Sequence, residues 1–164
     1  MSGLIIRPYR TEDAAALATV FHRAVRRGAA RHYTLPQRMA WSPRPQTAEH
    51  WDTRLSRLDT MVAEDGRGLL GFMALNLDDA FLDFAYVLPE AAGRGVGGTL
   101  LAVLEGRAKS AGIDRLETEA SRVAEPFFAA RGWSVLRRQR VRRHGIGLPN
   151  AVMEKPLVAA EVAA

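Results

Sequence analysis

The sequence of 164 residues contains no cysteine and no long hydrophobic run. The lack of cysteine excludes disulfide scaffolds, thiol nucleophiles and cysteine metal sites. No apolar run approaches the roughly 20 residues that span a bilayer, and no basic segment followed by an apolar stretch predicts a secretory signal. The hydrophobic fraction of 48% still suffices for a sizeable core. These features predict a cytoplasmic protein without membrane contact, with one domain over residues 1–157 and a disordered tail over 158–164.

Apolar periodicity predicts the helices and strands of the N-terminal half. A helix begins near Thr11, which can cap it, and runs to Arg27; a second helix covers residues 47–58. The segment 31–46 between them is rich in proline and is predicted to be irregular. Glycine- and aspartate-containing turns separate the strands that follow, which indicates an antiparallel meander. The predicted strands of this half lie at 4–7, 60–64, 69–75 and 81–87.

The C-terminal half alternates between the two kinds of element. Its strongest helix, 96–111, carries one apolar face and ends at Gly112. The other predicted elements are a strand at 115–120, a helix at 123–131 and strands at 133–141 and 150–157. The fold class is therefore α+β, with a central mixed, mostly antiparallel, twisted sheet of about seven strands flanked by about four helices.

The most informative segment is the turn AGRGVGGT, residues 92–99, which follows a strand and opens a helix. The first turn of a helix has unpaired N–H groups and a positive dipole end, and glycine lets a phosphate approach that backbone closely. The turn is interpreted either as an anion site or as a tight connection that binds nothing. The Walker pattern lacks its lysine here, and the preceding meander disfavours a dinucleotide fold.

The order of these segments resembles the GNAT superfamily of acyl-CoA-dependent N-acetyltransferases. The run LDFAYVLPE, the turn GRGVG and the following helix look like its strand, pyrophosphate loop and helix. SRVAEPFFAARGW resembles its second cofactor motif, and LPNAVMEK its closing strand. Segment 21–51 is similar to one bacterial branch whose substrates are largely unassigned. The resemblance spans nearly the whole chain and implies acetyl-CoA as co-substrate and a small-molecule amine or a protein amino group as acceptor.

The resemblance also implies which residues contact the co-substrate. The end of the strand 81–87 would contact the pantetheine arm, and its exposed backbone N–H groups would donate to the thioester carbonyl. The glycine turn would hold the pyrophosphate. Two positions depart from the usual pattern: Ala92 replaces a glutamine or arginine, and Phe128 replaces the tyrosine thought to protonate the leaving thiolate. Ser121 is expected to reach the co-substrate, or only to cap a helix. The predicted cofactor-binding residues are Ala85, Tyr86, Val87, Gly93, Arg94, Gly95, Val96, Gly97, Gly98, Ser121, Phe127 and Phe128.

Asp83 is the first candidate for proton transfer. By strand alternation it shares a face with Phe81, Ala85 and Val87. A carboxylate on an otherwise apolar face is interpreted either as a general base, with a pKa raised by burial, or as the structural partner of an arginine.

His32 and Tyr33 are further catalytic candidates, because GNAT proteins commonly build the acceptor side of the cleft from this segment. Histidine suits a base, and the tyrosine hydroxyl can replace the missing acid; packing is the alternative for both. No metal is expected, because His22, His50 and His144 show no ligand spacing with carboxylates.

Positive charge comes almost entirely from arginine, which supplies 21 of the 23 basic residues at a formal net charge of +5. The surplus is concentrated in RRQRVRR, residues 137–143, which is interpreted as a solvated strand edge or as a surface for RNA, an acidic substrate or the 3′-phosphate of CoA. The run contains no aromatic residue, which disfavours nucleic acid. The alternative to an enzyme is a non-catalytic acyl-CoA-binding or nucleic-acid-binding module on the same fold; a homodimer is compatible with either function.

Overall fold

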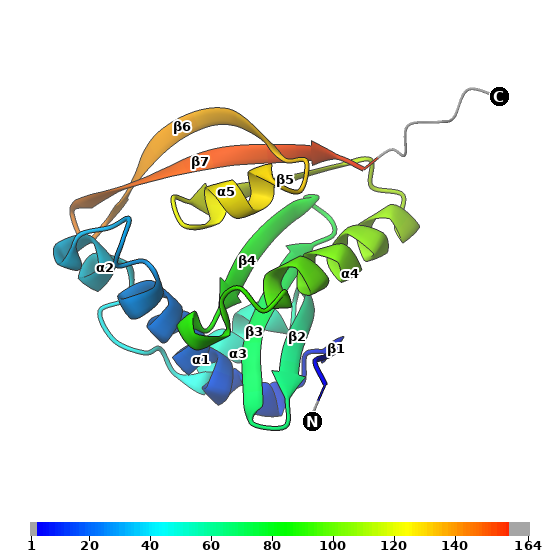
Figure 1. Ribbon diagram of the computed structural model, residues 1–164, viewed down its shortest axis with the longest axis horizontal. Helices are drawn as coiled ribbons and strands as arrows, with labels where there is room; N and C mark the ends of the chain where they lie inside the picture. The colour runs from blue at the N-terminus through cyan, green and yellow to red at the C-terminus, as the bar shows by residue number, and fades with distance from the viewer. Residues whose placement is uncertain (1–2, 158–164) are drawn as a thin grey trace.

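The computed structural model describes residues 3–157, which form one seven-stranded mixed sheet covered by five α-helices (Figure 1). The sheet has the order β1-β2-β3-β4-β5-β7-β6. Its strands are β1 (Ile5–Pro8), β2 (Asp59–Asp65), β3 (Gly68–Asn76), β4 (Phe81–Val87), β5 (Arg115–Ser121), β6 (Ser134–Arg143) and β7 (Ile146–Pro156). The helices are α1 (Ala14–Arg23), α2 (Leu35–Trp41), α3 (Ala48–Leu55), α4 (Val96–Ser110) and α5 (Ala124–Ala129). The predicted α+β class with its mixed sheet is confirmed, while the tail expected at 158–164 lies outside the described residues.

Two apolar clusters hold the helices to opposite faces of the sheet. Leu100 and Leu104 of α4 are fully buried in one cluster, together with Leu82 of β4. Leu17 of α1 and Trp51 of α3 belong to the other cluster. Burying a large apolar side chain contributes about 1.5–3 kcal/mol, so these residues fix both layers. In Figure 1, α4 crosses in front of the lower strands, and α2 lies beside the turn that joins β6 to β7.

The sheet opens between β4 and β5. Neighbouring strands are antiparallel everywhere except at this pair, which is parallel and in register only at Phe81–Glu117 and Leu82–Thr118. Beyond Leu82 the two strands separate, while β5 continues along β7 as far as Ser121. The backbone of β4 from residue 83 onward is therefore not paired on its β5 side.

Two local predictions differ from the structure. The segment 31–46 is not wholly irregular, because Thr34 and Gln37 form a capping box that starts α2: the Gln37 N–H donates to Thr34 Oγ1 at 3.2 Å, and the Thr34 N–H donates to Gln37 Oε1 at 2.9 Å. Thr11 is not a helix cap but the first residue of a 3₁₀ turn, and after Arg23 the first helix continues as a π-helical turn, Ala24–Gly28.

The last strand is longer than predicted. It begins at Ile146 rather than at Asn150, because its pairing with β6 extends to a tight turn in which His144 and Gly145 have φ angles of 48° and 76°. Within residues 3–157, no helix is both long and apolar enough to cross a membrane.

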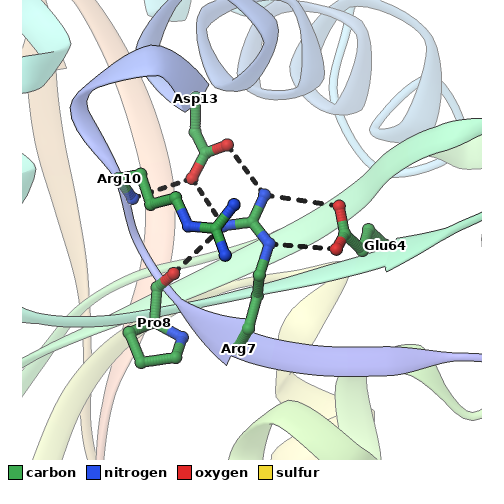
Figure 2. A network of polar contacts seen from close by, with 5 residues as sticks. All are labelled: Arg7, Pro8, Arg10, Asp13 and Glu64. Atoms are coloured by element: carbon green, nitrogen blue, oxygen red, sulfur yellow. Dashed lines mark hydrogen bonds and ion pairs between the residues drawn. The ribbon is translucent and has the colours of Figure 1, made fainter.

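A polar network ties β1 to β2 and to the turn before α1 (Figure 2). The Arg7 guanidinium donates to both carboxylate oxygens of Asp13 at 2.9 Å and to Glu64 Oε1 at 3.0 Å. The Arg10 N–H donates a further 2.8 Å bond to Asp13. Because Asp13 lies in the turn before α1 and Glu64 on β2, Arg7 joins three segments at one point.

Candidate active site

Two cavities lie on either side of the opening between β4 and β5. The first has a volume of about 550 Å³ and is walled by the glycine turn, the end of β4 and α5; we call it the loop cavity. The second has a volume of about 350 Å³ and is walled by α2, α3, β4, β5 and β7; we call it the aromatic cavity. Tyr86 and Ser121 line both cavities, so the two cavities adjoin at these residues.

The loop cavity has the geometry of an anion site. Gly93 and Gly95 have φ angles of 78° and 81°, which strongly favour glycine. This backbone turns directly into α4, whose first N–H groups have no intrahelical partner. The N-terminus of this 15-residue helix therefore points its N–H groups and its dipole at the cavity.

Helix α5 supplies the opposite wall of the loop cavity. A Cβ atom on Gly97 would lie 3.0 Å from the Phe127 ring, so any other residue there would require the ring to shift by a few tenths of an ångström. The Arg131 guanidinium lies 3.9 Å from the centroid of the Phe127 ring and lines the same cavity. Arg131 thus adds a full positive charge to the backbone groups of the turn, a contribution that sequence reasoning missed because arginine is so common in this chain.

Ser121 and Phe128 border the loop cavity at its inner end. Ser121 Oγ accepts a 3.2 Å hydrogen bond from the Ala124 N–H, which confirms the predicted capping role at the start of α5. Phe128 is 1% exposed, and its ring packs against Phe127 and Trp133 with centroids 5.2 and 5.0 Å apart. This side chain has no proton to give, so any acid must come from elsewhere.

The aromatic cavity takes its name from its walls. Phe21 packs edge-on against Tyr86 at 4.7 Å and lies 4.9 Å from Trp51, and Tyr33 packs against Trp41 at 5.4 Å. The polar side chains that line the cavity come from α3, the sheet and the segment before α3. They are Gln46, His50, Arg54, Asp83, Glu119, Ser121, Arg143 and Asn150.

A β-bulge places Asp83 on the aromatic cavity. Leu75 pairs with Leu82 and Ala74 with Phe84, so Asp83 is an extra residue that the register skips. The bulge interrupts the alternation of side chains along β4: Leu82 packs on the α4 side and Phe84 on the α1 side.

The predicted face of Asp83 is therefore wrong. Ala85 and Val87 pack toward α4, whereas Asp83 and Phe81 line the aromatic cavity. Burial and the nearby carboxylate of Asp79 raise the pKa of Asp83, and Arg54 lowers it in part. Among the described residues Asp83 forms no ion pair, so it is not the structural partner of an arginine.

Tyr33 reaches the aromatic cavity, and His32 does not. The Tyr33 hydroxyl donates to the Pro149 carbonyl oxygen at 2.5 Å and accepts from the Arg122 N–H at 2.9 Å. Burial raises the pKa of Tyr33, whereas the Arg122 N–H lowers it in part. His32 is exposed and lines neither cavity, so the structure does not bring the three predicted catalytic residues together.

Comparison with known proteins agrees with this geometry. The model of the acetyltransferase (GNAT) domain family matches residues 29–155. The chain belongs to the GNAT acetyltransferase family. It is 31% identical to the uncharacterized N-acetyltransferase YafP of Escherichia coli K12, over 93% of this chain and 96% of that protein. The enzyme class and the family resemblance expected from the sequence are confirmed.

Solved GNAT structures share the fold. A GCN5-related N-acetyltransferase from Rhodopseudomonas palustris has a TM-score of 0.87 at 35% identity, over 95% of this chain and 97% of that one. The PaiA N-acetyltransferase from Thermoplasma acidophilum, solved in complex with coenzyme A, has a TM-score of 0.76 at 22% identity, over 94% of this chain and 99% of that one. The likeness therefore extends over nearly the full length of both chains.

Glu119, Arg54 and Asn150 line this acetyltransferase's aromatic cavity and were not predicted as site residues, whereas Tyr86 was predicted only as a contact of the co-substrate. Glu119 shares a strand face with Ser121, since Ala120 between them is buried on the α4 side; that alternation was visible in the sequence. Arg54, Asn150 and the Tyr86 side chain depend on tertiary contacts. Burial raises the pKa of Tyr86, and a hydrogen bond with Trp41 lowers it only in part, so the hydroxyl stays protonated at neutral pH.

Two buried polar atoms of the cavity residues have no hydrogen-bond partner within the described part of the chain: Asn150 Oδ1 and Trp51 Nε1. Such groups are costly to leave unpaired, and a bound ligand is one way to satisfy them. No cluster of three or more histidine, aspartate or glutamate side chains within residues 3–157 could hold a metal ion.

Proposed function

We propose that this GNAT protein transfers the acetyl group of acetyl-CoA to the primary amine of a small molecule, without a covalent enzyme intermediate. The observation that carries the proposal is the junction of the two cavities at Tyr86 and Ser121. A donor in the loop cavity and an acceptor in the aromatic cavity would meet at this junction through the opening between β4 and β5. Holding both reactants in this way lowers the barrier by proximity alone.

The loop cavity fits the proposed donor. Its glycine turn offers backbone N–H groups, the dipole of α4 and the Arg131 guanidinium to a pyrophosphate. The cavity continues along Ala85, Tyr86 and Val87, where a pantetheine arm would lie. Acetyl-CoA supplies an activated thioester, and the unpaired β5-facing side of β4 supplies N–H groups that would polarise its carbonyl.

Asp83 is the proposed general base. Transfer forms a bond between the amine nitrogen and the acetyl carbon and breaks the carbon–sulfur bond, so the nitrogen loses one proton and the sulfur gains one. Asp83 lies on the acceptor side, and its pKa is raised toward the operating pH, where a general base is most effective. The bulge turns Asp83 into the aromatic cavity, whereas Ala85 and Val87 of the same strand pack toward α4.

Tyr86 is the proposed hydrogen-bond donor to the leaving sulfur. Tyr86 lines both cavities and, because burial raises its pKa, its hydroxyl keeps its proton. The Tyr33 hydroxyl lines only the aromatic cavity and is engaged with two backbone groups. That geometry favours a positioning role for Tyr33 over the acid role predicted from the sequence.

A thiol-release assay with acetyl-CoA tests the proposed function. Polyamines, amino acids, aminoglycosides and peptides are offered as acceptors, and products are identified by mass spectrometry. We expect amine-dependent release of CoA together with an N-acetylated product. If CoA raises the midpoint of thermal unfolding but no amine releases thiol, the protein is a binding module and the proposal is wrong.

A further inference from the structure

The aromatic cavity contains unpaired charges of both signs. Asp83 and Glu119 are its carboxylates, and Arg54 and Arg143 are its guanidinium groups. Among the described residues none of these four forms an ion pair, although Arg7, Arg107, Arg138 and other arginines do pair with carboxylates. All four residues are exposed to solvent, and a ligand that fills the cavity would withdraw their charges from water, so it binds best when it supplies partners of opposite sign. A ligand that carries both a cation and an anion would supply both partners at once.

Arg54 is placed to receive the anionic group. It follows Trp51 on α3, and its guanidinium carbon lies 5.8 Å from the centroid of the Phe84 ring. Phe84 comes directly after Asp83, and Arg54 is near enough to lower the pKa of that carboxyl. The Arg54 donors have no recorded acceptor within residues 3–157, so the planar fork is free for a carboxylate or a similar acid group.

We infer that the acceptor is a small zwitterion of the amino acid type, whose amine lies beside Asp83 and whose acid group is bound by Arg54. This inference rests on the proposed function and names the substrate class of the same site. Arg54 lies over the ring of Phe84, the residue next to Asp83. A ligand that contacts both Arg54 and Asp83 must therefore carry its acid group and its amine close together, as an α- or β-amino acid does. The aromatic walls of the cavity would cover the side chain of this amino acid, and the cavity volume of about 350 Å³ suits a molecule of this size.

The alternatives fit the cavity less well. A simple diamine or polyamine would place positive charge near Arg54 and Arg143, which disfavours its binding. An acid without an amine would leave Asp83 and Glu119 unpaired and offer no nucleophile. A zwitterion also brings N–H donors toward Asn150, whose buried Oδ1 has no partner in the described chain.

Matched pairs of acceptors test the inference. The standard amino acids are each compared with the amine that lacks only the α-carboxylate, for example tyrosine with tyramine and histidine with histamine, and the same is done for β-alanine and ethylamine. We expect the wild-type protein to prefer the acid-bearing member of a pair. Arg54→Gln should lower kcat/KM for that member by about tenfold or more, since a charge-assisted hydrogen bond is lost. For the matching amine, kcat/KM should not fall when it is measured at a pH above the acidic limb of the pH–rate profile, where the effect of Arg54 on the pKa of Asp83 does not enter.

Two further variants make the outcomes distinguishable. Arg57→Gln is the matched control, because Arg57 is exposed and lines neither cavity. Arg143→Gln is measured in the same way, and a loss of acid preference at Arg143 alone would overturn the assignment to Arg54. Transfer to amines with no preference for the acid-bearing member would overturn the inference and leave the proposed function standing. Failure to acetylate any acceptor of the broad screen would instead refute the proposed function.

Discussion

Tyr33 and Pro149 lie 116 residues apart in the sequence, yet the Tyr33 hydroxyl donates a 2.5 Å hydrogen bond to the Pro149 carbonyl oxygen. The same hydroxyl oxygen accepts the Arg122 N–H at 2.9 Å. One buried side chain thus joins the segment before α2 to β7 and to the start of α5. Tyr33 and Pro149 both line the aromatic cavity, so this contact holds its wall in place.

Tyr33→Phe distinguishes between two roles for this tyrosine, positioning of the cavity wall and donation of a proton in the reaction. The variant leaves the Pro149 oxygen and the Arg122 N–H without their partner, which should lower the free energy of unfolding by about 1–3 kcal/mol. If Tyr33 positions the wall, KM for the acceptor should rise while the alkaline limb of the pH–rate profile stays in place. A fall of about 10²–10⁴ in kcat with a changed alkaline limb would instead support the acid role predicted from the sequence.

Asp83→Asn should lower turnover by about 10²–10⁴, because it removes the proposed base while keeping the shape of the side chain. The base works only when deprotonated, so wild-type activity should fall as the pH drops through the raised pKa of Asp83. The variant should lack this acidic limb and should still bind CoA. Asp78→Asn is the control, since Asp78 is exposed and lines neither cavity. Near-full activity in Asp83→Asn would rule out the assignment.

Arg54→Gln should move the acidic limb to higher pH. Arg54 lowers the pKa of Asp83, so its neutralisation lets burial and Asp79 raise that pKa further. The measurement uses a simple amine as acceptor, so that loss of the proposed acid contact does not affect the rate. An acidic limb that stays at its wild-type pH would show that Asp83 is not the group that titrates there.

Local sequence signals predicted the parts of the fold that depend on neighbouring residues. The helix at 96–111 and its glycine turn follow from periodicity and from the conformational freedom of glycine, and both are found. Helix α2 was missed, although the spacing of Thr34 and Gln37 is that of a capping box and was available in the sequence. Prolines around it outweighed this signal.

The chemistry of the site could be predicted less well, because it depends on contacts between distant segments. The face of Asp83 is set by a register shift against β3, which no pattern within β4 reveals. The role of the Tyr86 side chain depends on the separation of β4 from β5 after Leu82. Nothing in the sequence distinguishes Arg54 from the other arginines, and only the fold shows that it lies over Phe84.

Gly95→Glu should abolish CoA binding. Glutamate at a φ of 81° is strained, and its carboxylate would face the pyrophosphate. CoA at a hundredfold excess over its Kd should stabilise the wild-type protein by about 2.7 kcal/mol, seen as a rise in Tm, and should not stabilise the variant. Gly106→Glu on the same helix is the control, since a side chain there meets no atom within 4 Å. An equal rise in Tm for both variants would exclude the turn as the CoA site.

The last prediction concerns the network of Arg7, Asp13 and Glu64 (Figure 2). Asp13 is buried, its side chain being 9% exposed, and burial alone would raise its pKa. The hydrogen bonds from Arg7 and from the Arg10 N–H outweigh that effect, so the pKa of Asp13 is lowered. A carboxyl group whose pKa is lowered by folding stabilises the fold at every pH where it is ionised in both states.

Asp13→Asn should therefore lower the free energy of unfolding by about 2–3 kcal/mol at neutral pH, because it leaves the Arg7 charge with one carboxylate instead of two. The difference from the wild type should persist down to the ordinary aspartate pKa of about 3.9 and shrink as the pH falls toward the lowered pKa of the folded state. Urea unfolding at a series of pH values measures it. Glu90→Gln, which removes the exposed pair of Glu90 with Arg23, should change stability little at any pH. A difference for Asp13→Asn that does not change between neutral pH and pH values below the lowered pKa would show that the Asp13 charge does not stabilise the fold.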